Sequence, residues 1–196
     1  MKKITLLLAL MITTVTAAQD SQQSETIYKR DTAKNELSLN VFNILIFGAI
    51  DGGYERILSD YSSISLEVFS KKINKNEGED FDLSKAYSKE FSLTTKFKYF
   101  FQERNTAWGF YAEGFAMYSD GFNDKDVEVT NPDGQLVSEE IDVEYTDVAI
   151  GVGVGGKFVA KKGFLLDLSF GFGRNMFNRD SPDLVVVPNI NVGYRF

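Results

Sequence analysis

The clearest pattern along the chain is a strict alternation of apolar and polar residues over short segments. Over residues 90–101 the apolar set is Phe91, Leu93, Thr95, Phe97 and Tyr99, and the polar set is Ser92, Thr94, Lys96 and Lys98. Successive side chains of a strand point to opposite faces, so this period of two predicts a β-strand with one apolar face and one polar face. The last thirteen residues, LVVVPNINVGYRF, show the same pattern from Val186 onward.

Applied to the whole chain, this pattern predicts eight strands. They cover residues 36–47, a segment ending at Ile57 or Leu58, 63–70, 90–101, 108–118, 143–158, 164–172 and 184–196. In the first strand the alternation breaks over 43–47, where either a bulge or a short helical turn fits, and a short connection, 48–53, follows. The connections after strands two, four and six are short, and those after strands three, five and seven are longer. Short periplasmic turns and longer outside loops are typical of bacterial membrane barrels.

The composition of the two strand faces indicates which one lies outside. The apolar face carries Phe, Leu, Val and Ile, whereas the other face carries Gly151, Gly153, Gly155 and Gly171. Glycine weakens a strand without packing anything, so these positions suit a narrow interior that large side chains must share. Aromatic residues near the predicted strand ends fit interfacial girdles; they are Tyr99, Phe100, Phe101, Trp108, Tyr118 and Phe122. We therefore predict an all-β fold, an eight-stranded antiparallel up-and-down transmembrane β-barrel with short periplasmic turns and longer extracellular loops.

The first residues have the pattern of an export signal. Lys2 and Lys3 precede a mostly apolar run over 4–15, which is too short to cross a bilayer as a helix. Small residues follow, and we expect cleavage after Ala18, with Ala17 as the alternative. The predicted organisation is a signal peptide over 1–18, a flexible periplasmic lead over 19–35 and the barrel over 36–196.

Composition narrows the function classes. The net charge of −7 disfavours sequence-independent nucleic-acid binding, which relies on a basic surface. The chain has no cysteine and no histidine, so it lacks thiolate and imidazole metal ligands and the usual base for a hydroxyl nucleophile. We predict no catalytic residue, no cofactor and no metal site, and therefore a protein that is not an enzyme.

Charged residues recur on the faces predicted to point inward. They are Glu55, Glu67, Lys96, Lys98, Glu113, Asp147, Lys157, Asp167 and Arg195. An eight-stranded barrel is just wide enough for side chains to fill it, and an unpaired buried charge is costly. We therefore predict a structural ion-pair network that fills the lumen. A gated ion path is the alternative interpretation of the same charges.

The connection over 120–142 is the longest and most acidic. At its centre Asn131, Pro132, Asp133 and Gly134 form a strong turn signal, with valines before the turn and leucine, valine and isoleucine after it. We predict a hairpin whose tip is Asn131–Gly134 and which extends the fifth and sixth strands out of the membrane on the cell surface. It is the candidate site for an extracellular protein partner. A solvated acidic loop without a partner is the alternative.

Three segments carry a resemblance to a known family: NELSLNVFNILIFGAIDGGYERIL (35–58), FLLDLSFGFGRNMFN (164–178) and SPDLVVVPNINVGYRF (181–196). They resemble small eight-stranded outer-membrane barrels of the OmpA/OmpX type and, more closely, the uncharacterised barrel family called domain of unknown function 3575. The resemblance implies a fold and a bacterial outer-membrane location, and no activity. The aromatic last strand resembles the closing strand that the barrel-assembly machinery recognises, which makes Tyr194 and Phe196 the candidate assembly signal.

The sequence therefore predicts a monomeric outer-membrane barrel with a non-enzymatic structural or surface-interaction, adhesin-like role. Its expected partners are outer-membrane lipid, the barrel-assembly machinery during biogenesis and the extracellular protein at 120–142. Two other functions stay open at this point: a narrow ion channel and a soluble periplasmic ligand-binding barrel.

Overall fold

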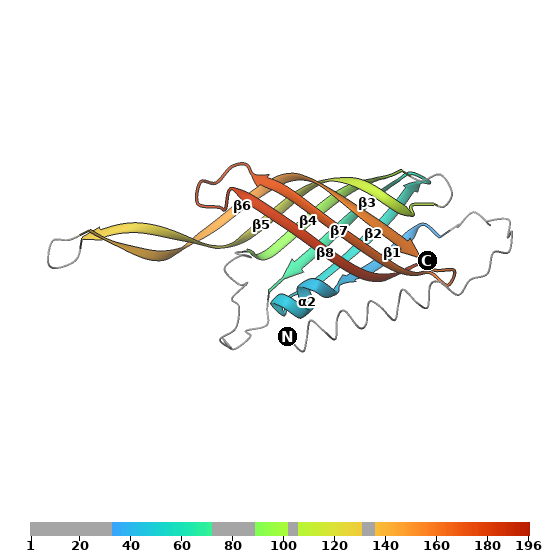
Figure 1. The fold of residues 1–196 in the computed structure, drawn as a ribbon, viewed down its shortest axis with the longest axis horizontal. Coiled ribbons are helices and arrows are strands. Elements are labelled where there is room, and N and C mark those ends of the chain that lie inside the picture. The colour runs from blue at the N-terminus through green and yellow to red at the C-terminus, as the bar shows by residue number, and fades with distance from the viewer. Residues whose placement is uncertain (1–32, 72–88, 102–105, 131–135) are drawn as a thin grey trace.

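The structure of the chain is a computed structural model, which describes residues 33–71, 89–101, 106–130 and 136–196. The chain folds into a closed barrel of eight antiparallel strands, each hydrogen-bonded to the next. The strands are β1 (Asn35–Asn40), β2 (Ile50–Ser59), β3 (Ser62–Ser70), β4 (Lys89–Phe100), β5 (Gly109–Thr130), β6 (Leu136–Val159), β7 (Phe164–Asn175) and β8 (Leu184–Arg195). The barrel closes where β8 pairs with β1, as Figure 1 shows. The predicted fold class, a closed eight-stranded antiparallel barrel, is confirmed. The predicted signal peptide and most of the predicted lead lie outside the described residues.

The barrel is polar inside and apolar outside. Lys96 and Lys157 on the inner face are 0% exposed, whereas Ile150, Val152 and Phe170 on the outer face are each more than half exposed. Tyr99 and Phe101 lie exposed at the end of β4, as predicted, and Tyr118 and Phe122 lie exposed in the middle of the longer β5, close to Gly121, where its pairing with β4 ends. Phe100 does not: it is fully buried inside the barrel, because the alternation of β4 turns it away from the face that carries Tyr99.

The second half of the first predicted strand is wrong, since residues 41–47 are helical. β1 ends at Asn40, and α2 (Val41–Phe47) follows. The Asn40 side chain caps this helix by accepting hydrogen bonds from the backbone N–H groups of Phe42 and Asn43. Gly48 ends it with a left-handed φ of 62°. Of the two alternatives for this segment, the helical one is therefore formed, and the connection to β2 is shorter than predicted because β2 already begins at Ile50.

β5 and β6 run far past the other strands. Their pairing continues to Thr130 and Leu136, whereas β4 pairs with β5 only as far as Gly121 and β7 pairs with β6 only as far as Ala149. The two strands therefore form a ribbon that projects from one end of the barrel (Figure 1). This ribbon is the strand extension that the turn signal predicts. The predicted tip, Asn131–Gly134, lies outside the described residues. No helix in the described part of the chain is long and apolar enough to cross a membrane.

Glycines on the inner face make room for aromatic side chains. The ring of Phe115 lies so close to Gly151 that a Cβ atom there would collide with it, and it also lies near Gly171 and Gly173. Tyr111 occupies the space above Gly155 in the same way. The predicted use of these glycines, to admit large side chains from other strands, is confirmed.

We predict that Gly151→Ala destabilises the folded barrel by about 1–3 kcal/mol, because the added methyl group overpacks the lumen against the Phe115 ring. The measurement is urea unfolding of the barrel refolded into detergent micelles. Gly114→Ala is the matched control, since no heavy atom lies within 4 Å of the added carbon there, and its effect should stay below about 0.5 kcal/mol. Equal effects of the two substitutions would contradict the packing argument.

Candidate functional site

The charged lumen is the only set of predicted site residues that the strands bring together within the described residues. One cluster is centred on two lysines. The Lys98 Nζ atom lies 2.9 Å from Glu55 Oε2 and 2.7 Å from Asp167 Oδ2. The Lys157 ammonium group bonds Glu36 at 2.7 Å and also contacts Glu55. These contacts join five strands: β1, β2, β4, β6 and β7.

A second cluster lies on the neighbouring wall. The Lys96 Nζ atom lies 2.7 Å from Glu67 Oε2 and 4.0 Å from Glu113 Oε1. This cluster joins β3, β4 and β5. The lumen therefore holds a buried ion-pair network, and its lysines lie between carboxylates from strands on either side of them.

Asp147 does not belong to either cluster, which corrects its predicted place in the network. Its carboxylate accepts hydrogen bonds from the backbone N–H groups of Phe177 and Asn178, at 2.9 and 3.0 Å, and from the Ser181 hydroxyl group at 2.5 Å. The physical reason is its position at the end of the β6–β7 pairing, where the connection between β7 and β8 folds over it. Asp147 therefore holds a loop in place.

Glu36 is a network residue that the sequence reasoning missed. It accepts from Lys157 and lies 2.6 Å from Arg195. Its signal was present, because Glu36 precedes the alternating Leu37 and Leu39 and so shares the polar face of the first strand. Tyr111 was also missed; its hydroxyl group donates to Asp167 Oδ1 at 2.6 Å.

Arg195 is the network residue at the end of the barrel where the start of β1 pairs with the end of β8. Besides Glu36, its guanidinium group donates to the backbone carbonyls of Thr106 and Ala107 at 2.8 and 2.9 Å. Thr106 is the last residue of the predicted turn 102–106, the rest of which lies outside the described residues, and Ala107 follows it. Arg195 therefore ties the closing strand to the segment that enters β5.

Buried apolar clusters lie inside the barrel on both sides of the charged residues along its axis. Towards the short-turn end, a buried cluster consists of Ile57, Phe100, Ala107 and Tyr111. Towards the hairpin end lie two others, one of Phe115, Met117, Ala149 and Val187 and one of Phe47, Ala49 and Phe69. Buried apolar side chains therefore pack near the ion pairs towards both ends of the barrel, while the Arg195–Glu36 pair reaches the short-turn end and Glu67 lines a polar cavity at the hairpin end.

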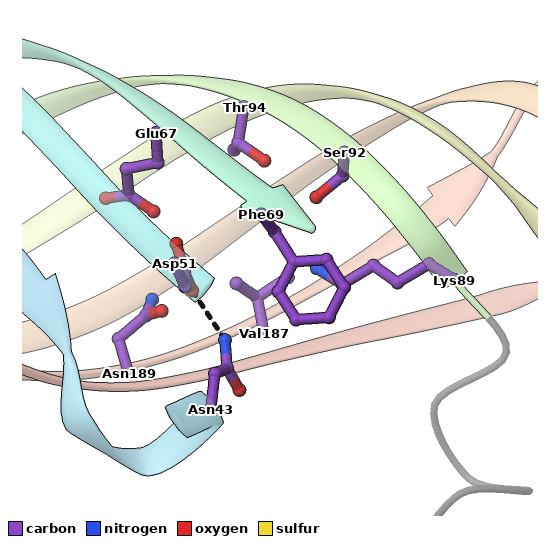
Figure 2. A pocket seen from close by; sticks show the side chains of 9 residues that line it. All are labelled: Asn43, Asp51, Glu67, Phe69, Lys89, Ser92, Thr94, Val187 and Asn189. Atoms are coloured by element: carbon purple, nitrogen blue, oxygen red, sulfur yellow. Dashed lines mark hydrogen bonds between the residues drawn. The ribbon is translucent and has the colours of Figure 1, made fainter. Parts of the chain in front are cut away.

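A small polar cavity of about 10 Å³ lies at the hairpin end, which is room for about one water molecule. Figure 2 shows Asn43 of α2 reaching Asp51 there, with Lys89 beside the Phe69 ring. Asn43 and Asn40 both donate to Asp51 Oδ2, at 2.5 and 3.0 Å. Within the described residues no group of three or more potential metal ligands is assembled. This cavity is a packed junction between α2 and the barrel rather than a site shaped for a substrate.

The remaining predicted site residues lie on the outside or beyond the described residues. Tyr194 and Phe196 are both exposed at the end of β8. The backbone of Phe196 exchanges hydrogen bonds with Asn35, at 2.8 and 3.0 Å.

Comparison with known proteins adds one likeness of fold. No family model and no curated protein matches the chain, so membership of the family called domain of unknown function 3575 stays a prediction. Among solved structures, the chain is similar to the N-terminal β-barrel domain of OprF from Pseudomonas aeruginosa. The two share 11% identity over 84% of this chain and 98% of that domain, with a TM-score of 0.41. A likeness at this level concerns the fold alone.

We predict that Lys98→Met destabilises the barrel by about 3–5 kcal/mol, because it leaves the buried Asp167 and Glu55 carboxylates without this partner. Adding Asp167→Asn removes one of those charges while keeping an acceptor for the Tyr111 hydroxyl group. The double variant should therefore be more stable than Lys98→Met alone. Urea unfolding of all four forms gives the coupling energy between the two positions. A single substitution that costs less than about 1 kcal/mol would show that these charges are not buried as a pair.

Proposed function

We propose that this chain is a bacterial outer-membrane β-barrel protein with a non-enzymatic structural or surface-interaction role. The observation that carries the proposal is the reversed polarity of the barrel, with charges inside and exposed Phe, Leu, Ile and Val side chains around its outside. Soluble monomers rarely expose contiguous apolar patches larger than a few hundred Å². A lipid-facing apolar band around a polar interior is the pattern of membrane barrels.

The placement of exposed aromatic residues supports the same proposal. Tyr99, Phe101, Phe164 and Tyr194 lie at the end that holds the short turns and the β1–β8 termini, and Tyr118 and Phe122 lie towards the hairpin. Exposed aromatic residues towards both ends of the barrel fit the two interfaces of a bilayer. The apolar band between them is where we place outer-membrane lipid.

A structural role fits the lumen better than conduction. The lysines of its two ion-pair clusters and Arg195 lie within ion-pair distance of carboxylates, and buried apolar clusters fill part of the lumen towards both ends. An ion would have to displace both kinds of packing. The narrow ion channel therefore stays the second candidate, and the charged interior is the only observation that favours it.

The projecting ribbon is the part of the molecule that we propose for surface interaction. Beyond Gly121 and Ala149 the described strands on either side of the ribbon do not pair with it, although the β7–β8 connection bonds the carbonyls of Thr146 and Val148. We propose that an added strand pairs with an edge of the ribbon farther from the barrel. Its acidic residues discourage pairing between copies of the ribbon. We therefore propose an extracellular protein as the partner at 120–142 and a monomeric barrel.

The ends of the chain complete the proposal. We propose that residues 1–18 are a cleaved signal peptide and that 19–35 lead into the barrel from the periplasm. Tyr194 and Phe196 stay the proposed assembly signal for the barrel-assembly machinery, and their exposure on the outer face of the closing strand supports that role.

We predict that the full chain stays in the membrane pellet of fractionated cells through high-salt and carbonate washes and is released by detergent. A chain that ends at Arg195 should reach the membrane in a smaller amount, since it lacks the terminal aromatic residue. Release of the full chain by carbonate alone would favour the soluble periplasmic barrel. Equal amounts of the two chains in the membrane would remove Phe196 from the assembly signal.

We predict that the refolded protein shows no steady conductance in planar lipid bilayers, because paired charges and apolar layers fill its lumen. Discrete, reproducible conductance steps would overturn the structural role and favour the channel. Phe100→Ala is an informative companion variant. It opens the apolar layer at the short-turn end without removing a charge, so steps that appear only in this variant would identify that layer as the seal.

We predict that the ribbon lies outside the cell and the β6–β7 turn lies in the periplasm. Ser138→Cys and Lys161→Cys each introduce a unique thiol, since the chain has no cysteine, and both positions are exposed. On intact cells, a membrane-impermeant maleimide should label position 138 and leave position 161 unlabelled until the cells are broken. The opposite pattern would invert the topology and remove the extracellular partner from the proposal.

A further inference from the structure

The wall of the barrel has a gap at its closing seam. β8 has twelve residues and β1 has six, and their pairing runs only from Asn40 opposite Asn191 to Glu36 opposite Arg195. Residues 184–190 of β8 therefore have no partner on β1. On the other side of the gap, Ile50 and Asp51 of β2 pair with β3 but not with β1.

The residues at the edge of this gap suit a strand whose hydrogen-bonded pairing with its neighbour stops part of the way along. Asn40 Oδ1 accepts a hydrogen bond from the backbone N–H of Ile190 at 3.3 Å, so a side chain continues the ladder where the β1 backbone stops pairing. Backbone groups two residues apart in a strand point to the same side, so the nitrogen of Pro188 faces the gap as well. Proline has no N–H group, which makes it suited to a strand edge without a neighbour.

α2 occupies the gap. It packs against β8 and β2, and Figure 1 shows it at the side of the barrel, following β1. Its inner face is fixed by Asn43, which donates to Asp51, and by Phe47, which is buried with Ala49 and Phe69. The helix therefore stands beside the half of β8 that β1 leaves uncovered.

The outer face of α2 is apolar and continues the outer surface of the strands. Ile44, Leu45 and Ile46 are 39%, 51% and 36% exposed. On the adjoining strands Leu39 and Ile50 are also more than half exposed. The helix begins level with Ile190, because its capping residue Asn40 bonds the Ile190 N–H, and it packs against β8, whose Val186, Pro188 and Ile190 have outward parity. Its exposed face therefore adjoins the apolar band.

We infer that α2 is a lipid-facing wall element: it replaces the missing half of β1, and Ile44, Leu45 and Ile46 contact acyl chains of the leaflet at the hairpin end. This inference rests on the proposed membrane location. An open strand edge is not tolerated in hydrocarbon, where each backbone polar group needs a partner inside the protein. A capped helix satisfies most of its own backbone groups, and its packing against β8, with Asn40 accepting from the Ile190 N–H, keeps the uncovered part of that strand out of the hydrocarbon. The barrel therefore stays sealed although one strand is too short.

The test is quenching of tryptophan fluorescence by lipids brominated on their acyl chains. Trp108 is the only tryptophan, so Trp108→Phe gives a silent background for single tryptophans. In that background, Leu45→Trp should be quenched at least half as strongly as Val152→Trp, a position on the outer face of β6. Lys161→Trp, in the exposed β6–β7 turn, should be quenched by aqueous acrylamide and not by the lipid. Ile44→Trp and Ile46→Trp repeat the measurement, so the result does not depend on one folded variant.

The outcomes separate this inference from the proposal beneath it. If Val152→Trp is not quenched by lipid, the barrel itself is not in the bilayer and the proposed function fails. If Val152→Trp is quenched while positions 44, 45 and 46 respond only to acrylamide, the membrane barrel stands and the lipid-facing helix is overturned. Formation of a disulfide dimer by Leu45→Cys in vesicles, with no lipid quenching at position 45, would overturn it in favour of a second copy of the chain as the occupant.

Discussion

The pairing of buried charges across the lumen is the constraint on which the rest of the structure depends. Lys157 and Arg195 both contact Glu36, so the ion pairs connect the first strand to the sixth and the last. Lys157 and Lys98 then share Glu55. A slip of one residue in any of these strands would turn its charge from the interior to the outside and leave a buried partner uncompensated. The network therefore specifies strand register and barrel closure together.

Filling the same narrow space sets the second constraint, which is volume. Tyr111 and Phe115 of β5 point into the lumen. The space for their rings is left by glycines on β6 and β7, which are Gly155, Gly151 and Gly171. Large and small residues on facing strands complement one another, so the lumen is packed like a protein core.

Much of the fold could be predicted because its signals are local. A period of two identified most of the strands, although the second strand alternates poorly, and the same period placed Lys96, Lys98, Lys157 and Asp167 inside. Other features depend on contacts that no local pattern reports. The alternation of β6 points Asp147 towards the lumen, but its carboxylate is hydrogen-bonded to the β7–β8 connection instead of to a lumen lysine. The helical segment 41–47 is too short to display a helical period, so its only local sequence signals are the capping residues Asn40 and Gly48. Phe100 was predicted at a rim because its neighbours in the sequence are aromatic, although the alternation of β4 points its side chain into the lumen.

The two ends of the barrel are built differently. At the short-turn end Arg195 holds the entry to β5, and an apolar cluster closes the lumen behind it. At the other end Asp147 fixes the β7–β8 connection, and that connection in turn holds the ribbon, since Lys125 bonds Asp180 at 2.6 Å and Asn123 donates to the Asp180 carbonyl at 2.8 Å. The ribbon is therefore braced where it leaves the barrel. This bracing would favour the proposed pairing with a partner strand, because a preorganised edge loses less conformational freedom on binding.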